Sequence, residues 1–391
     1  MKIDALVDPS QKLTNEEIKR YARHILLPEV GSQGQQRIKN AKVLVIGAGG
    51  LGSPVLLYLA GAGVGEIGIC EFDVVEESNL QRQIIHSNSK IGQSKAQSAK
   101  EKVLDLNPLI KVNLHEEKLT SKNALNIIKN YDLVIDGTDN FATRYLINDA
   151  CVLLNKPFIW GSIYRFDGQL SVFWKKHGPC YRCLHPTPPP SNMVPSCATG
   201  GVLGSMCATI GSLQVTQALA IITGMAEVLI GEVLSYAAVQ SSFNKIKISK
   251  DQNCVICGNN PSLTELIDYE EFCNNQSVVL DPGISVSELA KMLVAKKDEA
   301  KDFLLVDVRE ESENKLVNIA GSVLINKDDI LSGEKLNLLP LDKPVVLYCR
   351  SGSRSNEVLA YLRHNGYLQT QHLAGGILAW IKEMEPTKPT Y

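Results

Sequence analysis

Four glycines near the N-terminus follow an apolar run and have the spacing of a turn that cradles phosphate groups. The run Val43–Ile46 is typical of a strand buried on both faces of a parallel sheet, and Ser53–Ala60 has the composition of a helix. Glycines between a strand and a helix let backbone N–H groups approach a polyphosphate where the helix dipole favours an anion. These glycines are Gly47, Gly49, Gly50 and Gly52. On their own they indicate a site for a nucleotide or a dinucleotide.

Polar side chains beyond the glycines favour a nucleoside triphosphate. Asp73 ends the second expected strand, Glu66–Phe72, about twenty positions after the glycines, where a carboxylate can bind a ribose hydroxyl. A triphosphate that loses pyrophosphate builds up more negative charge than a dinucleotide carries, and it needs cations around it. A surface loop with two basic residues is also common, so the cations favour ATP over a dinucleotide without excluding one. The polar side chains of the loop are Asn79, Arg82, Gln83 and Lys95.

A carboxylate beyond a third expected strand is suited to hold Mg²⁺. The stretch Leu133–Ile135 predicts a buried strand, and Asp136 and Asp139 follow it. Ligands of open α/β sheets bind outside the carboxyl ends of the strands, and Mg²⁺ prefers oxygen ligands. Asp139 is therefore a candidate ligand of Mg²⁺ on a triphosphate. Capping of the next helix by Asp139 or Asn140 is a structural alternative that is compatible with this role.

Two Cys-x-x-Cys pairs predict a structural zinc site. Four thiolates arranged as a tetrahedron form a closed zinc site, and two such pairs supply the four ligands. A redox-active pair is the alternative, but the presence of two pairs favours zinc. The four candidate ligands are Cys180, Cys183, Cys254 and Cys257.

Two further cysteines are candidate nucleophiles. Cys197 lies in the proline-rich stretch 185–201, which cannot form a helix or a central strand and predicts a long, functional loop. A small buried apolar side chain is the alternative for this cysteine. Cys349 directly follows a second apolar run, Pro344–Tyr348, and a helix is expected from about Ser355. Cys349 thus begins a second strand–loop–helix motif.

The loop after Cys349 suits a thiolate or a persulfide anion. Backbone N–H groups, the helix dipole, Arg350 and Arg354 would all favour a negative charge on sulfur. Cysteine phosphatases place five residues between their Cys and Arg, whereas Arg354 comes one position earlier here. The shorter loop encloses less space and suits a sulfur atom better than a phosphate group.

The composition indicates a large globular protein with ordinary cores. The chain has 391 residues, 44% of them hydrophobic, and a formal net charge of −2, which gives no case for nucleic-acid or membrane binding. The N-terminus is polar and lacks an apolar signal core, so ten cysteines suit a reducing compartment, and we expect a cytoplasmic protein. Polar residues interrupt the apolar stretch 201–224, which predicts a helix in a core or a subunit interface.

The chain resembles two known families along almost its whole length. Residues 12–258 resemble the adenylating enzymes of the MoeB/ThiF group, relatives of the ubiquitin-activating enzymes, which implies a Rossmann-like α/β domain. A linker is expected at 259–277, and residues 278–388 resemble a smaller α/β domain of the rhodanese type. The order of the two domains is similar to that of MoeB–rhodanese fusions. The matching motifs are RYARHILL (20–27), GAGGLG (47–52), Asp73, SNLQRQ (78–83), Lys95, DGTDN (136–140), both cysteine pairs, LVDVRE (305–310), the Cys349 loop and GGILAW (375–380).

The resemblance implies a reaction and its partners. ATP would adenylate the C-terminal glycine of a small ubiquitin-fold sulfur-carrier protein ending in Gly-Gly, of the MoaD and ThiS kind. A persulfide on Cys349 would then supply sulfur to give a thiocarboxylate, with a cysteine desulfurase or thiosulfate as the sulfur donor. Such carriers serve the synthesis of molybdopterin, thiamine and cysteine, and tRNA thiolation.

The resemblance also assigns roles to residues. Asp73 would bind the ribose, Arg82 and Lys95 the phosphates, and Asp139 the Mg²⁺. Arg23, on a polar stretch (14–39) that otherwise predicts a solvated surface helix, would reach into the site of a neighbouring subunit, which implies a homodimer. Cys197 would either cleave an acyl disulfide between the carrier and Cys349 or first form a thioester with the carrier.

One motif departs from the rhodanese pattern, and two other functions remain in view. Rhodanese domains usually show G-H-I-x-G-A/S where this chain has VNIAGS at 317–322, so we expect weak standalone turnover of thiosulfate. The alternatives are an NAD-dependent oxidoreductase with an appended sulfur-binding domain and a non-catalytic scaffold that binds carrier proteins. The cationic loop and Asp139 argue against the oxidoreductase.

Overall fold

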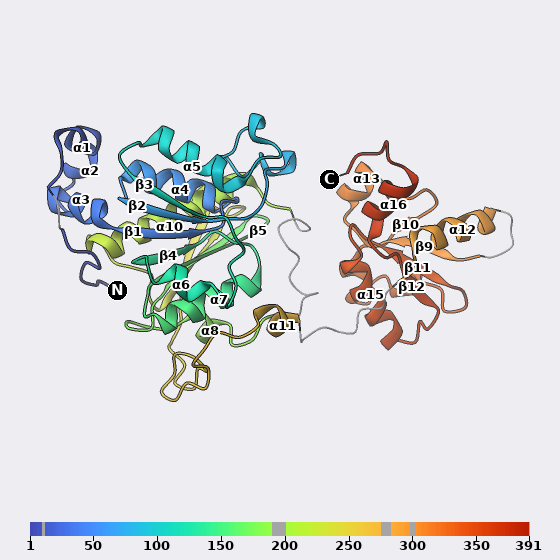
Figure 1. Cartoon of the computed structure of the whole chain (residues 1–391). Coiled ribbons are helices and arrows are strands. Elements are labelled where there is room, and N and C mark those ends of the chain that lie inside the picture. The colour runs from blue at the N-terminus through green and yellow to red at the C-terminus, as the bar shows by residue number, and fades with distance from the viewer. Residues whose placement is uncertain (10–11, 190–200, 275–282, 298–301, 391) are drawn as a thin grey trace. The chain divides into compact units, whose positions relative to one another are not determined.

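The chain folds into two α/β units, each built on its own sheet (Figure 1). The structure is a computed structural model that describes residues 1–9, 12–189, 201–274, 283–297 and 302–390. The described residues up to 274 form the N-terminal unit, and those from 283 form the C-terminal unit. Both sheets have parallel strands at their centre, which confirms the predicted α/β class.

Short apolar runs form the centre of the N-terminal sheet, whose strand order is β3-β2-β1-β4-β5-β6-β7-β8. The strands from β3 to β5 are parallel, and β6, β7 and β8 continue the sheet in antiparallel pairing. The four residues of β4 are all buried, as expected of a strand covered by helices on both faces. The strands are β1 (Lys42–Ile46), β2 (Glu66–Cys70), β3 (Lys111–His115), β4 (Leu133–Asp136), β5 (Phe158–Tyr164), β6 (Asp167–Phe173), β7 (Glu232–Ala237) and β8 (Ser242–Lys247).

Helices cover both faces of this sheet, because successive side chains of a strand point to opposite sides. Val43 and Val45 join the apolar cluster beneath α3, α4, α5 and α10, whereas Leu44 and Ile46 join the cluster beneath α6, α7, α8 and α11. Figure 1 shows α4 and α5 on one side of the sheet and α6 and α7 on the other. The helices are α3 (Gly31–Asn40), α4 (Gly52–Ala62), α5 (Lys95–Leu106), α6 (Ala124–Ile128), α7 (Phe141–Leu153), α8 (Tyr181–Leu184), α10 (Gly204–Thr223) and α11 (Tyr269–Asn274).

The polar N-terminal stretch is helical but broken. It forms α1 (Asn15–Arg20), α2 (Ala22–Ile25) and then α3. Thr14 caps α1 and Glu17 completes a capping box, as the sequence predicts. Between β2 and α5, residues 71–94 hold only the short 3₁₀ helices η1 (Glu77–Asn79) and η2 (Asn88–Lys90). Irregular backbone therefore carries Arg82 and Gln83, whereas Lys95 is the first residue of α5.

The apolar stretch expected to form a buried helix is α10, the core helix of the N-terminal unit. By length and composition alone it could cross a membrane, but it packs against α4, β5 and β6. The contact with α4 is close, because a Cβ at Gly211 would lie 2.6 Å from Cγ of Pro54. Small residues such as Gly211 therefore let α10 lie close to α4 and be buried in the core.

The C-terminal unit has a parallel four-stranded sheet in the order β10-β9-β11-β12. Helices α12 and α16 pack on one face, and α14 and α15 on the other. The elements are α12 (Val286–Lys297), β9 (Leu304–Asp307), α13 (Glu311–Leu316), β10 (Val323–Leu324), α14 (Lys327–Leu331), η3 (Leu336–Leu338), β11 (Val345–Tyr348), α15 (Ser353–His364), β12 (Thr370–His372) and α16 (Gly376–Met384).

The stretch 259–277, which the sequence indicates as a linker, packs onto the N-terminal unit in its described part. It contains α11, where Tyr269 is buried and its hydroxyl donates to Asp149 Oδ2 at 2.8 Å. The guanidinium of Arg182 lies 4.6 Å from the ring centroid of Phe272. These two aromatic side chains, together with Leu266 and Ile267 of the same stretch, therefore fix this segment to the N-terminal unit.

Candidate active sites

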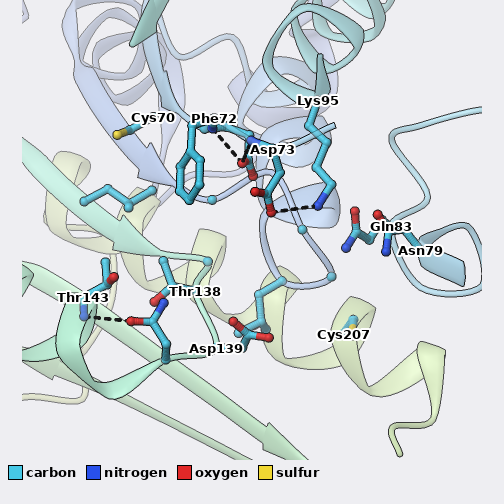
Figure 2. Close-up of a pocket in the computed structure, with 18 of the residues that line it drawn as sticks. Cys70, Phe72, Asp73, Asn79, Gln83, Lys95, Thr138, Asp139, Thr143 and Cys207 are labelled. Atoms are coloured by element: carbon cyan, nitrogen blue, oxygen red, sulfur yellow. Dashed lines mark hydrogen bonds and ion pairs between the residues drawn. The ribbon is translucent and has the colours of Figure 1, made fainter. Parts of the chain in front are cut away.

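A cavity of about 400 Å³ opens at the carboxyl ends of β1, β2 and β4, where ligands of open α/β sheets bind. Figure 2 shows Asp73 and Lys95 on one side of it and Thr138 and Asp139 on the other. The volume is within the usual range of small-molecule sites. The predicted nucleotide-site residues that line it are Gly47, Gly49, Gly50, Asp73, Asn79, Arg82, Gln83, Lys95 and Asp139.

The glycine loop needs its glycines for two different reasons. Gly47 has a φ of +90°, a left-handed conformation that residues with a Cβ rarely adopt. Gly52 does not line the cavity but is buried beneath the loop, where a Cβ would lie 1.9 Å from the carbonyl oxygen of Gly47. Gly52 therefore lets the loop fold tightly, whereas a Cβ at Gly49 would meet only Nε2 of Gln83, at 3.6 Å.

Glu71, which the sequence analysis did not single out, fixes the glycine loop to the end of β2. One carboxylate oxygen accepts a hydrogen bond from the N–H of Ala48 at 2.9 Å. The other accepts from the N–H groups of Phe72 and Asp73 at 2.8 and 2.9 Å. A charged residue inside the apolar run EIGICEF is the sequence signal that could reveal this role.

His86 is the second residue that sequence reasoning missed. Its Nε2 lies 3.0 Å from the carbonyl oxygen of Ala48, and its Nδ1 lies 2.9 Å from the hydroxyl of Ser98. Burial lowers the pKa of His86, so the ring is neutral near pH 7, with Nε2 donating to the carbonyl and Nδ1 accepting from Ser98. Glu71 and His86 thus hold the N–H and the carbonyl of the same loop residue, Ala48.

Lys95 brings a buried cation to the cavity. Its side chain is 8% exposed, and its Nζ lies 3.3 Å from Oδ2 of Asp73 (Figure 2). The backbone N–H of Lys95 also donates to the carbonyl of Asp73 at 2.9 Å, which ties the start of α5 to the end of β2. Arg82 lines the same cavity, and one of its terminal nitrogens donates to the carbonyl of Ser78.

Asp136 and Asp139 have different surroundings. Asp136 is fully buried, and its Oδ1 accepts from the N–H and hydroxyl of Thr138 at 2.8 and 2.7 Å. Its Oδ2 lies 3.6 Å from Nε of Arg144, and burial raises the pKa of Asp136 to about 6. Asp139 is exposed to the cavity, because Asn140 rather than Asp139 caps α7 through the N–H of Thr143.

Two other predicted residues do not line this cavity. Arg23 is exposed on α2 and does not contribute to the cavity of its own chain. Cys197, the candidate nucleophile of the proline-rich stretch, lies outside the described residues.

The two Cys-x-x-Cys pairs come together as one cluster. The four sulfur atoms all lie within 4.8 Å of one another, and neighbouring pairs are 3.4 to 3.9 Å apart. Four Zn–S bonds of about 2.3 Å in a tetrahedron would set the sulfur atoms about 3.8 Å apart, so the cluster fits such an ion. The cluster comprises Cys180, Cys183, Cys254 and Cys257.

The loop after β11 surrounds the thiol of Cys349 with donors. Cys349 is 1% exposed, and its sulfur accepts from the N–H of Gly352 at 3.1 Å. The hydroxyl of Ser355, in the first turn of α15, lies 3.6 Å from the same sulfur. One backbone N–H and one hydroxyl therefore lie within hydrogen-bond distance of this sulfur, and both are groups that can donate to it.

Arg354 has a different contact from the one expected. Its guanidinium binds the Glu313 carboxylate of α13 through two hydrogen bonds of 2.6 and 2.7 Å. A carboxylate thus balances this charge, which the sequence alone does not reveal because Glu313 is distant along the chain. The pair joins the first turn of α15 to α13.

The fold and these sites define an adenylyltransferase unit joined to a sulfurtransferase unit. The chain belongs to the ThiF family, which it matches over residues 21–256, and it carries a rhodanese-like domain at residues 285–383. It is similar to the probable adenylyltransferase/sulfurtransferase MoeZ of Mycobacterium tuberculosis, with 51% identity over 99% of this chain and 98% of the relative. It is also similar to the adenylyltransferase and sulfurtransferase MOCS3 of Culex quinquefasciatus, with 43% identity over 97% and 91%.

These comparisons confirm the resemblance drawn from the motifs. The protein is an enzyme with adenylyltransferase and sulfurtransferase activity, which the oxidoreductase and scaffold alternatives do not explain. Crystal structures of MccB from E. coli share the fold at a TM-score of 0.56 and 22% identity, covering 63% of this chain and 76% of MccB. One of them is described as MccB with ATP.

Proposed function

We propose that the enzyme uses ATP to adenylate the C-terminal glycine of a small ubiquitin-fold sulfur-carrier protein and then converts that carboxyl group to a thiocarboxylate. The observation that carries the proposal is the cavity of the N-terminal unit. It combines a glycine loop, the cations of Arg82 and Lys95 and the carboxylate of Asp139. A nucleoside triphosphate requires this set, and the crystal structure described as MccB with ATP supports the same ligand.

The lining residues suggest how ATP is held. The glycine loop would take the phosphates at the N-terminal end of α4, and Asp73 would bind the ribose. Lys95, now 3.3 Å from Asp73, would turn with Arg82 toward the phosphates and stabilise the charge on departing pyrophosphate. Asp139 would hold Mg²⁺, which neutralises phosphate charge when bound.

The adenylation step needs no protein base. The carrier's carboxylate is already a nucleophile, and one of its oxygens attacks the α-phosphorus while the bond to pyrophosphate breaks. The products are the carrier acyl-adenylate and pyrophosphate, and no proton moves. The site has only to align the two groups and stabilise the leaving charge.

Sulfur transfer would use Cys349. Its thiolate takes the outer sulfur of a donor, and the resulting persulfide attacks the acyl-adenylate and expels AMP, which leaves an acyl disulfide on the enzyme. Cys197 would then attack the sulfur of Cys349, releasing the thiocarboxylate and leaving a Cys197–Cys349 disulfide. The alternative order, in which Cys197 first forms a thioester with the carrier, gives the same product.

Three further features belong to the proposal. The four-cysteine cluster would hold Zn²⁺ as a structural ion, since all four ligand positions are protein thiolates. Arg23 would complete the site of a second copy in a homodimer. The donor, a cysteine desulfurase or thiosulfate, and the carrier would meet the enzyme in the cytoplasm.

Exchange of labelled pyrophosphate into ATP tests the first half of the proposal. Exchange should appear only when a carrier ending in Gly-Gly is present, and a carrier whose C-terminus is amidated serves as the matched control. Mass spectrometry then tests the second half, because the carrier should exchange one oxygen for sulfur when a persulfide donor is added. Absence of exchange with every cellular carrier ending in Gly-Gly would overturn the proposal.

A further inference from the structure

A line of three buried polar side chains runs from the reactive thiol into the C-terminal unit. Ser355 Oγ lies 3.6 Å from Cys349 Sγ and 3.4 Å from Nδ1 of His372. The exposed fractions of Cys349, Ser355 and His372 are 1%, 0% and 5%. The serine hydroxyl is therefore a bridge between a thiol and an imidazole that bulk water hardly reaches.

The fold places the three groups independently of one another. Cys349 follows β11, and His372 ends β12, which pairs with β11 in parallel so that Leu347 is opposite His372. Ser355 comes from the first turn of α15, after Gly352 turns the loop with a φ of +99°. Two adjacent strands and one helix thus converge on a single hydroxyl group.

A purely structural role would not require the imidazole. Ser355 Oγ also donates to the carbonyl of Gly352 at 3.0 Å, a local bond that is enough to shape the turn. A hydroxyl group rotates freely between acceptors, so the same oxygen can face Nδ1 of His372. The contact between Ser355 Oγ and His372 Nδ1 is the observation that points to proton transfer.

The charged groups of the surrounding elements leave the imidazole as the proton acceptor nearest to this hydroxyl among the described residues. Arg350 shares the loop with Cys349, and an arginine cannot accept a proton. Three carboxylates on the elements packed around α15, β9 and β11 are each paired with a cation. These pairs are Arg354 with Glu313 of α13, Lys327 of α14 with Glu357, and Arg309 with Asp307 of β9.

We propose that Ser355 and His372 form a proton relay that generates the thiolate of Cys349. The thiol proton passes to Ser355 Oγ while the proton of Ser355 passes to His372 Nδ1. After the transfer, the Nδ1–H of His372 donates to Oγ of Ser355. The hydroxyl of Ser355 in turn donates to the sulfur anion of Cys349. The inference rests on the proposed role of Cys349 as the sulfur acceptor.

Bonds and protons balance when Cys349 takes up sulfur through this relay. The thiolate attacks the outer sulfur of a donor persulfide, so that an S–S bond forms to Cys349 and the donor's S–S bond breaks. The donor leaves as a thiolate and takes a proton from water, while His372 returns its proton to water. No oxidant or reductant is consumed.

Alkylation of Cys349 in the full-length protein by iodoacetamide tests the relay. The rate is followed between pH 5 and 9 by mass spectrometry of the peptide that contains Cys349. Both Ser355→Ala and His372→Gln should raise the pH of half-maximal rate by about one unit, which is about a tenfold loss of rate at neutral pH. The double variant should equal either single variant, because the two residues act as one chain.

Matched controls come from the same unit. Ser332→Ala and His364→Gln replace exposed residues outside the Cys349 loop and should leave the pH profile of Cys349 unchanged. His372→Gln keeps a polar side chain of similar size, so it remains informative if Ser355→Ala fails to fold, and circular dichroism verifies the fold.

Sulfur uptake from glutathione persulfide separates failure of the relay from failure of the proposed function. If Cys349→Ala still accepts sulfur at the loop, the proposed role of Cys349 is wrong. If Cys349→Ala abolishes uptake while both relay variants keep the wild-type pH profile, the relay alone is wrong. A shifted profile in both relay variants with unchanged controls supports the relay.

Discussion

Asp136 and Asp139 are three positions apart, yet the fold gives them opposite environments. Asp136 is buried against Thr138 and Arg144, where it shapes the loop, whereas Asp139 faces the cavity. The sequence predicts that both follow a strand, but not which one points inward. That distinction depends on whether Asn140 or Asp139 caps α7 and on the contact between Asp136 and Arg144, and the residue pattern leaves both open.

Asp136 should make the stability of the N-terminal unit depend on pH. Burial raises the pKa of Asp136 from 3.8 to about 6, so between these values the unfolded chain holds fewer protons than the folded one. The free energy of unfolding therefore falls as the pH rises from about 4 to 6, by about 3 kcal/mol from this group. Urea denaturation of the wild type and Asp136→Asn at several pH values measures the difference. The prediction would be contradicted if the free energies of unfolding of the two proteins differed by the same amount at every pH in this range.

Glu71 should matter for ATP binding although it has no predicted contact with ATP. Glu71→Gln would place an amide group against an N–H of the glycine loop, at a cost of about 1–3 kcal/mol for the unpaired donors. We expect the KM for ATP in pyrophosphate exchange to rise about tenfold or more. The exposed Glu77→Gln is the matched control. Wild-type KM in Glu71→Gln would show that the carboxylate is not needed to hold the loop.

Elements with continuous apolar runs could be predicted from the sequence, whereas an exposed strand and a helix held by distant residues could not. The runs around residues 43, 67, 134, 305 and 346 became β1, β2, β4, β9 and β11 because both faces of these strands are covered. In contrast, β8 is largely exposed, so its sequence has no continuous apolar run. Helix α11 escaped prediction because its stability comes from Asp149 and Arg182, more than 80 positions earlier.

The cysteine cluster connects two of these elements. Arg182 lies between the first two cysteines, is 3% exposed, and binds Asp149 through both carboxylate oxygens. It also lies against the rings of Tyr145 and Phe272. A disordered cluster would therefore release α8 and, with it, the contacts that hold α11.

If the cluster holds the proposed zinc ion, its removal should destabilise the N-terminal unit selectively. Calorimetry of the full-length protein, before and after chelation, should show a lower unfolding temperature for that unit by at least about 5 °C, since a unit of this size loses roughly 2–4 °C per kcal/mol. The transition of the C-terminal unit should not move. Cys254→Ser should reproduce the effect without a chelator, and metal analysis gives the content of each sample. Equal unfolding temperatures with and without metal would refute a structural ion.

At the scale of the whole molecule, two complete α/β units divide the chemistry. Each has its own sheet and its own apolar clusters on both faces of that sheet. The candidate ATP site belongs to the first unit, and the thiol loop belongs to the second. A substitution in one site should therefore leave the chemistry of the other intact.

Reciprocal variants of the intact chain test this division. Asp139→Ala should lower carrier-dependent pyrophosphate exchange about a hundredfold or more, because it removes a charged group from the phosphate site. It should leave sulfur uptake on Cys349 unchanged. Cys349→Ala should keep exchange at the wild-type rate and lose sulfur uptake, and both variants should fail to form thiocarboxylate. Asp105→Ala, at an exposed carboxylate outside both sites, should retain all three activities. Loss of both partial activities in either single variant would mean that the two sites do not operate separately.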